Sequence, residues 1–145
     1  MIFMVGKHNI SFFGKDQGLI VNTSSYNDKI HLNFIQKIDN KWQKLPEGIQ
    51  IAIDINEICE VAEFLENKKG SVNLIHKSPY NEDVKNFIFE FNQQKDTLFI
   101  KAKFDNKPDY KKFSKPIKGG DLRVFLKLWI HMENEKIENY HSLNK

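Results

Sequence analysis

Apolar and polar residues alternate over most of this chain, and the alternation gives way twice to the spacing of an amphipathic helix. Isoleucine occupies every second position of the segment 49–55, which is the period-2 pattern of a strand with one buried face. Apolar residues then recur with a period of about 3.6 until a Lys-Lys-Gly sequence ending at Gly70 indicates the helix end. Asp54 followed by Glu57 is typical of a capping box. We therefore predict a strand that runs directly into a helix.

A second strand–helix joint follows near the end of the chain with similar spacing. The helix is expected to open at Gly119-Gly120-Asp121 and to run to about Glu138, with residues 139–145 as a flexible tail. The corresponding positions of the two joints are Ile49, Ile53, Glu57, Ile58, Val61, Ala62 and Leu65 in the first, and Phe113, Ile117, Asp121, Leu122, Phe125, Leu126 and Trp129 in the second. This correspondence predicts two copies of one unit.

Each joint is preceded by a series of short alternating segments. Turns of two to five residues separate most of them, which favours antiparallel meanders over βαβ crossovers. We predict an α+β fold of two ββββα repeats, 8–70 and 71–138, in a single domain 1–145, with one face of each sheet packed by helices. The expected strands are Asn9–Phe13, Leu19–Thr23, Ile30–Ile38, Lys41–Lys44 continuing after an interruption at Leu45–Gly48 into Ile49–Ile55, then Ser71–Lys77, Val84–Asn92, Thr97–Phe104 and Lys112–Lys118.

Composition limits the class of protein only broadly. The 145 residues carry a net charge of +3, which permits an anionic partner without requiring one. No apolar run reaches the roughly 20 residues of a membrane span, and no secretory signal pattern follows the first residues. The one cysteine, Cys59, is expected to be a small buried side chain on a helical face. We expect a cytoplasmic protein without membrane association.

Motifs of enzyme active sites are absent from the sequence, including phosphate-binding, nucleophile-elbow and zinc-protease patterns. A row of glutamates at every third position from Glu57 to Glu66 is expected to be a solvated helix face. His131 and Glu135 have the i, i+4 spacing of metal ligands, but no third ligand lies near them in the sequence. We therefore predict no catalytic residues, no cofactor and no metal site.

The sheet faces turned away from the core carry a distinctive mixture of aromatic rings and lysines. Aromatic rings on an open sheet can stack with unpaired bases while lysines contact phosphates, which suits single-stranded nucleic acid. Phe87, Phe89 and Phe91 are expected to belong mainly to the core. The candidate nucleic-acid-binding residues are Phe13, Lys37, Lys41, Trp42, Lys44, Lys77, Phe99, Lys101 and Lys103.

The twofold ββββα order, with each last strand entering its helix directly at Ile49–Leu65 and Phe113–Trp129, resembles the Whirly-like superfamily. This superfamily includes the plant Whirly proteins, the kinetoplastid guide-RNA-binding proteins, the Pur-alpha proteins and an archaeal single-stranded DNA-binding family. The resemblance implies binding of single-stranded DNA or RNA across sheet surfaces, oligomerisation through the helices as a homodimer or larger assembly, and no catalysis.

Three functional hypotheses follow from these patterns. The first is a weakly sequence-specific single-stranded nucleic-acid-binding protein, with DNA slightly preferred over RNA. The second is a protein–protein adaptor of the same fold, in which the exposed face with Phe99 and Trp42 meets a partner protein. The third is a small β-rich ligand-binding or enzymatic domain.

Overall fold

The computed structural model of the protein describes residues 8–23, 29–44, 47–107 and 112–143. The turn predicted at Asn27-Asp28 and the proline of the predicted strand interruption lie outside these residues. No helix among the described residues is both long and apolar enough to cross a lipid bilayer.

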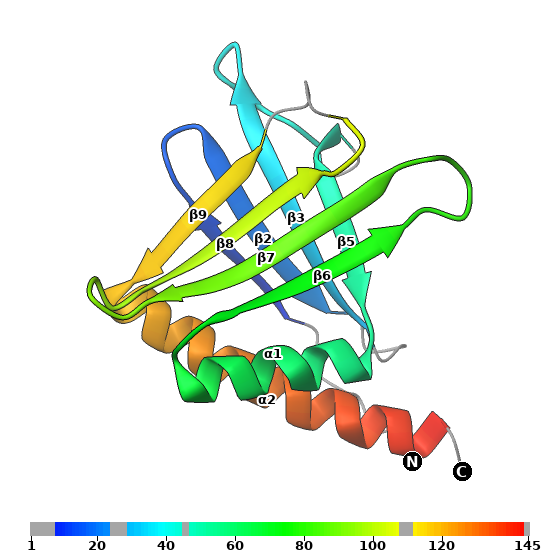
Figure 1. Ribbon diagram of the computed structural model, residues 1–145, viewed down its shortest axis with the longest axis vertical. Helices are drawn as coiled ribbons and strands as arrows, with labels where there is room; N and C mark the ends of the chain where they lie inside the picture. The colour runs from blue at the N-terminus through cyan, green and yellow to red at the C-terminus, as the bar shows by residue number, and fades with distance from the viewer. Residues whose placement is uncertain (1–7, 24–28, 45–46, 108–111, 144–145) are drawn as a thin grey trace.

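The first sheet consists of five antiparallel strands (Figure 1). The two-residue strand β4 and strand β5 both pair with β3, so they are two parts of one returning strand, as the sequence predicts. Asp39 and Asn40 form the tight turn before β4 with φ angles of 50° and 63°, a left-handed conformation that Asn and Asp tolerate well. The strands are β1 Asn9–Phe13, β2 Gln17–Thr23, β3 Ile30–Ile38, β4 Lys41–Trp42 and β5 Ile49–Ile53.

The second sheet has four antiparallel strands in the order β6-β7-β8-β9. These are β6 Ser71–Lys77, β7 Val84–Asn92, β8 Thr97–Phe104 and β9 Phe113–Lys118. Each predicted strand of this half is present within one residue of its expected limits. The prediction of two antiparallel meanders is therefore confirmed in both halves.

Helix α1 (Ile55–Asn67) follows β5 directly, and its start is fixed by the predicted capping box. The Asp54 carboxylate accepts a hydrogen bond from the backbone N–H of Glu57 at 3.0 Å, and Glu57 accepts one from the N–H of Asp54 at 3.2 Å. Helix α2 (Gly119–Leu143) follows β9 in the same way, with Asp121 in its first turn. The sequence pattern ends this helix near Glu138, but the backbone is helical to Leu143, so the helix is five residues longer than predicted.

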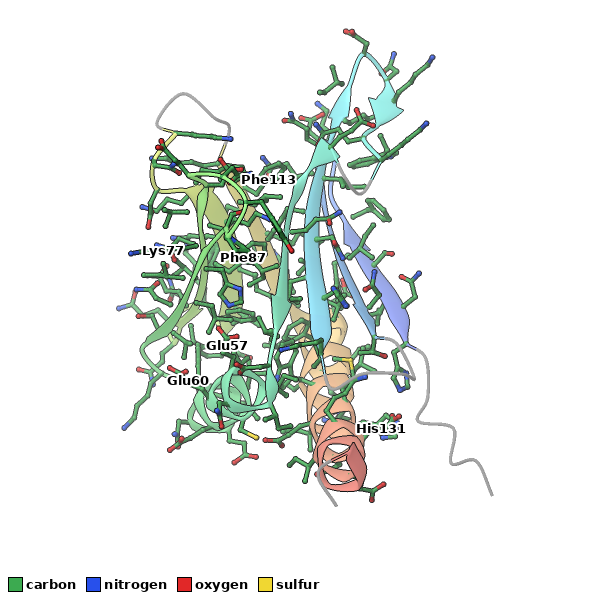
Figure 2. The ribbon with its side chains drawn as sticks, turned by 90° about the vertical axis from the view of Figure 1, so that its right-hand side faces the viewer. Glu57, Glu60, Lys77, Phe87, Phe113 and His131 are labelled. Atoms are coloured by element: carbon green, nitrogen blue, oxygen red, sulfur yellow. The ribbon has the colours of Figure 1, made fainter. Side chains whose placement is uncertain are left out.

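The two sheets cross each other, and both helices lie at one end of the resulting sandwich (Figure 1). Away from the helices the inner faces pack directly together, with the Phe34 ring centroid 5.8 Å from that of Phe87 and 5.4 Å from that of Phe113. Figure 2 shows Phe87 and Phe113 pointing into this space between the sheets. Phe87, Phe89 and Phe91 are all buried, as expected. Each inner face is thus covered partly by the helices and partly by the other sheet, and both repeats share one core.

Trp129 of α2 is fully buried where the helices meet the second sheet. Its ring centroid lies 5.9 Å from that of Phe89 and 5.7 Å from that of Phe125. The indole Nε1–H donates a hydrogen bond of 3.1 Å to the carbonyl oxygen of Ile58 in α1. Because buried Trp side chains need a partner for this N–H, the bond fixes how the two helices pack.

We expect Trp129→Phe to lower the free energy of unfolding by about 2 kcal/mol or more, since it leaves a cavity and removes the hydrogen bond to Ile58. Urea denaturation followed by circular dichroism measures this loss. Trp42→Phe is the matched control, because Trp42 is 36% exposed, and it should change stability by less than about 0.5 kcal/mol. Equal losses for both variants would contradict the role assigned to Trp129.

Candidate nucleic-acid interface

The candidate residues divide between the two sheets, whose outer faces point to opposite sides of the sandwich (Figure 2). Alternation along the strands places each of them, because successive side chains point to opposite faces of a sheet. Phe13, Lys37 and Trp42 lie on the outer face of the first sheet, and Lys44 follows Trp42 by two residues. Lys41, which directly precedes Trp42 in β4, points to the opposite side of that strand. The second sheet carries Lys77, Phe99, Lys101 and Lys103. The nine residues therefore do not form one continuous platform.

Phe13, Lys37 and Trp42 form a cluster on the first sheet, which we call the Phe13–Trp42 patch. The two rings are 49% and 36% exposed, and their centroids are 4.8 Å apart at an interplanar angle of 59°. Lys37 lies opposite Trp42 in the β3–β4 register, and its Nζ is 6.0 Å from the indole centroid. The patch thus presents two adjoining aromatic surfaces beside a positive charge.

Gly18 determines where the Phe13 ring rests. It pairs with Phe13 across β1 and β2, and a Cβ atom at this position would lie only 2.4 Å from Cδ1 of that ring. The ring therefore lies directly over the glycine backbone, which lets it approach Trp42. The sequence analysis did not identify this role of Gly18, although the pairing of a glycine with an outward aromatic residue across a hairpin is a usable signal.

The lysines around the Phe13–Trp42 patch have their charges available. Lys37, Lys41 and Lys44 make no ion pair with any other residue in the part of the chain that the structure describes. Lys41 and Lys44 are exposed and Lys37 is half-buried. These ammonium groups can bind an anionic ligand without first breaking an ion pair with a carboxylate.

The lysines of the second sheet are arranged differently, because two of them are paired. Lys101 Nζ lies 2.8 Å from Glu90 Oε2 and 5.8 Å from the centroid of Phe99, and Lys103 Nζ lies 3.6 Å from Asp105 Oδ1. The side chains of both pairs are partly exposed, so each pair is worth no more than about 1 kcal/mol. A phosphate group can displace such a carboxylate from its lysine at a small cost in free energy. Before a ligand binds, however, this face has less unpaired positive charge than the Phe13–Trp42 patch.

Lys77 is exposed at the end of β6, where Figure 2 shows it pointing outward from the second sheet. On the first sheet, burial lowers the pKa of His31, and the charges of Lys136 and Lys29 lower it further. His31 is therefore neutral at pH 7 and adds no positive charge to its face. Among the described candidate residues, only the lysines carry positive charge on the two outer faces.

The remaining titratable groups of α1 are structural. Glu60, Glu63 and Glu66 are exposed, as expected for a solvated row, whereas Glu57 caps the helix and lies 2.7 Å from His76 Nε2. Cys59 is half-buried rather than fully buried. Burial raises the pKa of its thiol, and a hydrogen bond to Glu133 together with the charge of that carboxylate raises it further. Cys59 is thus a poor nucleophile at neutral pH.

We expect Gly18→Ala to displace the Phe13 ring without unfolding the protein, because the ring is half exposed and can rotate away from the new methyl group. The emission and acrylamide quenching of Trp42 should change, measured in a Trp129→Phe background to remove the second tryptophan. Gly14→Ala is the control, since a Cβ there meets its nearest atom at 3.4 Å, an ordinary contact distance. Unchanged Trp42 fluorescence in Gly18→Ala would contradict the assigned ring position.

Neither a family model nor a curated protein sequence matches the chain. Solved structures do match it over nearly its whole length. "Crystal Structure of WHY1 from Arabidopsis thaliana" is 13% identical with a TM-score of 0.73, and the match covers 96% of this chain and 90% of that one. "Structure of the plant transcriptional regulator PBF-2" is 12% identical with a TM-score of 0.70, covering 96% and 87%.

A structure of MRP1/MRP2 from a trypanosome also matches, with 14% identity and a TM-score of 0.57 over 88% of this chain and 85% of that one. At such low identities a match in structure establishes the arrangement of the backbone. Two antiparallel sheets, each followed by a helix, agree with the architecture predicted from the two strand–helix joints, whereas the crossing of the sheets was not predicted. This chain therefore has the Whirly-like fold.

Proposed function

We propose that this protein binds single-stranded nucleic acid, DNA or RNA, with little sequence preference. The observation that carries the proposal is the Phe13–Trp42 patch, where two exposed rings 4.8 Å apart adjoin Lys37. Stacking of a base on an aromatic side chain is worth about 1–3 kcal/mol and tolerates every base, because each base has a π-face. The patch therefore offers affinity without base-specific hydrogen bonds.

The chemistry of this patch favours unpaired over paired strands. In a duplex the base faces are covered by stacking, so exposed rings gain little from them, whereas a single strand can turn its bases onto the rings. Lys44 lies two residues after Trp42 and can contact a phosphate beside a stacked base, whereas Lys41 lies on the opposite side of β4 and can contact the strand only where it passes around this edge. We assign the primary contact to this patch, and a secondary contact to Lys77, Phe99, Lys101 and Lys103.

The net charge of +3 limits how strongly phosphate contacts alone can hold a strand. With two phosphates neutralised by Lys37 and Lys44, a fourfold rise in salt should weaken binding to a single strand by about 7-fold. This dependence is moderate, so stacking must supply a large share of the affinity. We consequently expect removal of one ring to weaken single-strand binding more than removal of one lysine.

The resemblance to the Whirly-like superfamily supports the same function. PBF-2, a structural neighbour, is described as a plant transcriptional regulator. In line with that resemblance we propose that the protein self-associates through its helices, carries out no catalysis and acts in the cytoplasm. The preference between DNA and RNA, slight in favour of DNA, is part of the proposal.

The test is a fluorescence anisotropy titration of a labelled oligo-dT, an RNA of the same length and a duplex, at about 50 and about 200 mM salt. We expect binding to both single strands and weaker binding to the duplex. Trp42→Ala and Phe13→Ala should each weaken single-strand binding by roughly 5- to 100-fold, the equivalent of one lost stack. Unlabelled oligonucleotide should also quench the fluorescence of Trp42.

The double variant Lys101→Ala/Lys103→Ala serves as the comparison for the second face and should weaken binding less than Trp42→Ala. The opposite order would move the primary contact to the second sheet. Absence of binding to every oligonucleotide at low salt would overturn the proposed function. It would favour the adaptor hypothesis, in which the same exposed rings contact a partner protein.

A further inference from the structure

His8, His131 and Glu135 meet where the residue preceding β1 lies against α2. His8 Nε2 is 2.6 Å and His131 Nε2 is 2.5 Å from the same atom, Glu135 Oε1. The two imidazole rings form a T-shaped contact with centroids 5.1 Å apart. One ligand atom from each of the three residues can be chosen so that all lie within 4.8 Å of one another.

The backbone holds all three residues in place. The backbone N–H of His8 donates to Thr23 Oγ1 at 3.0 Å, and its carbonyl accepts from the N–H of Thr23 at 2.9 Å, so His8 is fixed to the end of β2. His131 and Glu135 are four residues apart on α2, which brings their side chains to one face of a rigid helix (Figure 2 labels His131). The cluster is therefore held by β2 and α2.

We propose that this cluster binds a Zn²⁺ ion through His8 Nε2, His131 Nε2 and Glu135 Oε1, with water as the fourth ligand. Imidazole nitrogen and carboxylate oxygen are ordinary Zn²⁺ ligands, and three protein ligands with one open position form a known type of tetrahedral site. His131 is 61% exposed, while His8 and Glu135 are 24% and 16% exposed in their side chains. An ion and its water can thus enter from the His131 side.

Tetrahedral bonds of about 2.0–2.1 Å separate neighbouring ligand atoms by about 3.3 Å. The observed nitrogen–oxygen distances of 2.5 and 2.6 Å require an opening of less than about 1 Å, which rotation of the exposed His131 side chain provides. The alternative is a purely hydrogen-bonded group, in which both imidazoles carry a proton on Nε2 and share one carboxylate oxygen. That arrangement needs no such opening, and titration with metal distinguishes it from a zinc site.

A bound ion would join the residue that precedes β1 to helix α2. His8 and Glu135 are separated by 127 positions in the sequence. A ligand that binds only the folded protein stabilises it, because unfolding separates the three donors and releases the ion. The proposed site is thus a cross-link of the native fold, distinct from the Phe13–Trp42 patch.

The test uses untagged, metal-free protein titrated with Zn²⁺ by calorimetry and with Co²⁺ by visible absorption. We expect one ion per chain at micromolar or tighter affinity, the intense d–d bands of four-coordinate Co²⁺, and a Tm that rises with Zn²⁺. His8→Ala, His131→Ala and Glu135→Gln should each weaken Zn²⁺ binding by at least about 10-fold and abolish the Tm rise. Circular dichroism of each variant without metal verifies that it is folded.

His76→Ala is the matched control, because His76 Nε2 also lies close to a carboxylate, 2.7 Å from Glu57, yet lacks a second histidine ligand. This variant should bind Zn²⁺ as the wild type does. Absence of micromolar binding to the wild type would overturn the proposal and leave the hydrogen-bonded group. Binding that survives both His8→Ala and His131→Ala would also overturn it, because the ion would then lie elsewhere.

Discussion

The burial of Trp129 against both α1 and the second sheet is the contact on which the rest of the structure depends. Neither sheet can cover its own apolar face, and a single helix, about 10–12 Å across, is too narrow to cover a whole sheet. Packing Trp129 beneath Phe89, with its N–H bonded to Ile58, closes the end of the sandwich where the two sheets no longer meet. At the other end Phe34 packs directly against Phe87 and Phe113, so the repeats complete one another's core. Because both inner faces are buried in this way, the outer faces are the only open surfaces that the two sheets offer within the described residues.

Most of the fold could be predicted from the sequence, because alternation and short turns are local signals. The period-2 pattern located every strand of the second sheet, and Asp54 with Glu57 marked the start of α1 by a side-chain mechanism that acts over three residues. The end of α2 was missed, since the helix continues past Glu138 where the apolar pattern weakens. The crossing of the sheets was also missed. It depends on which aromatic residues meet across the core, as with Phe34 and Phe113, and no spacing along the chain records that.

The candidate interface could be predicted only in part. Alternation assigned Phe13, Trp42 and Phe99 to outer faces, but it could not show that the first two touch while the third lies on the opposite side of the molecule. Whether each lysine is paired with a carboxylate was harder to predict. Lys101 and Lys37 are equivalent in a sequence, yet one is paired with Glu90 across the β7–β8 ladder and the other adjoins an indole ring. The third member of the histidine–glutamate cluster, His8, lies at the opposite end of the chain, so ligand spacing along the sequence could not reveal it.

The opposite orientation of the outer faces has a consequence for stoichiometry. A ligand that occupied both faces of one molecule would have to pass around an exposed edge strand, β1 or β9 on one side and β5 or β6 on the other. Two short ligands could instead occupy the faces separately without touching. A saturation ratio above one ligand per chain would therefore need no second copy of the protein. The number of ligand molecules bound per chain at saturation should fall once a ligand is long enough to pass around the edge strand. Measuring this ratio as a function of ligand length would therefore show how far apart the two faces are along the surface.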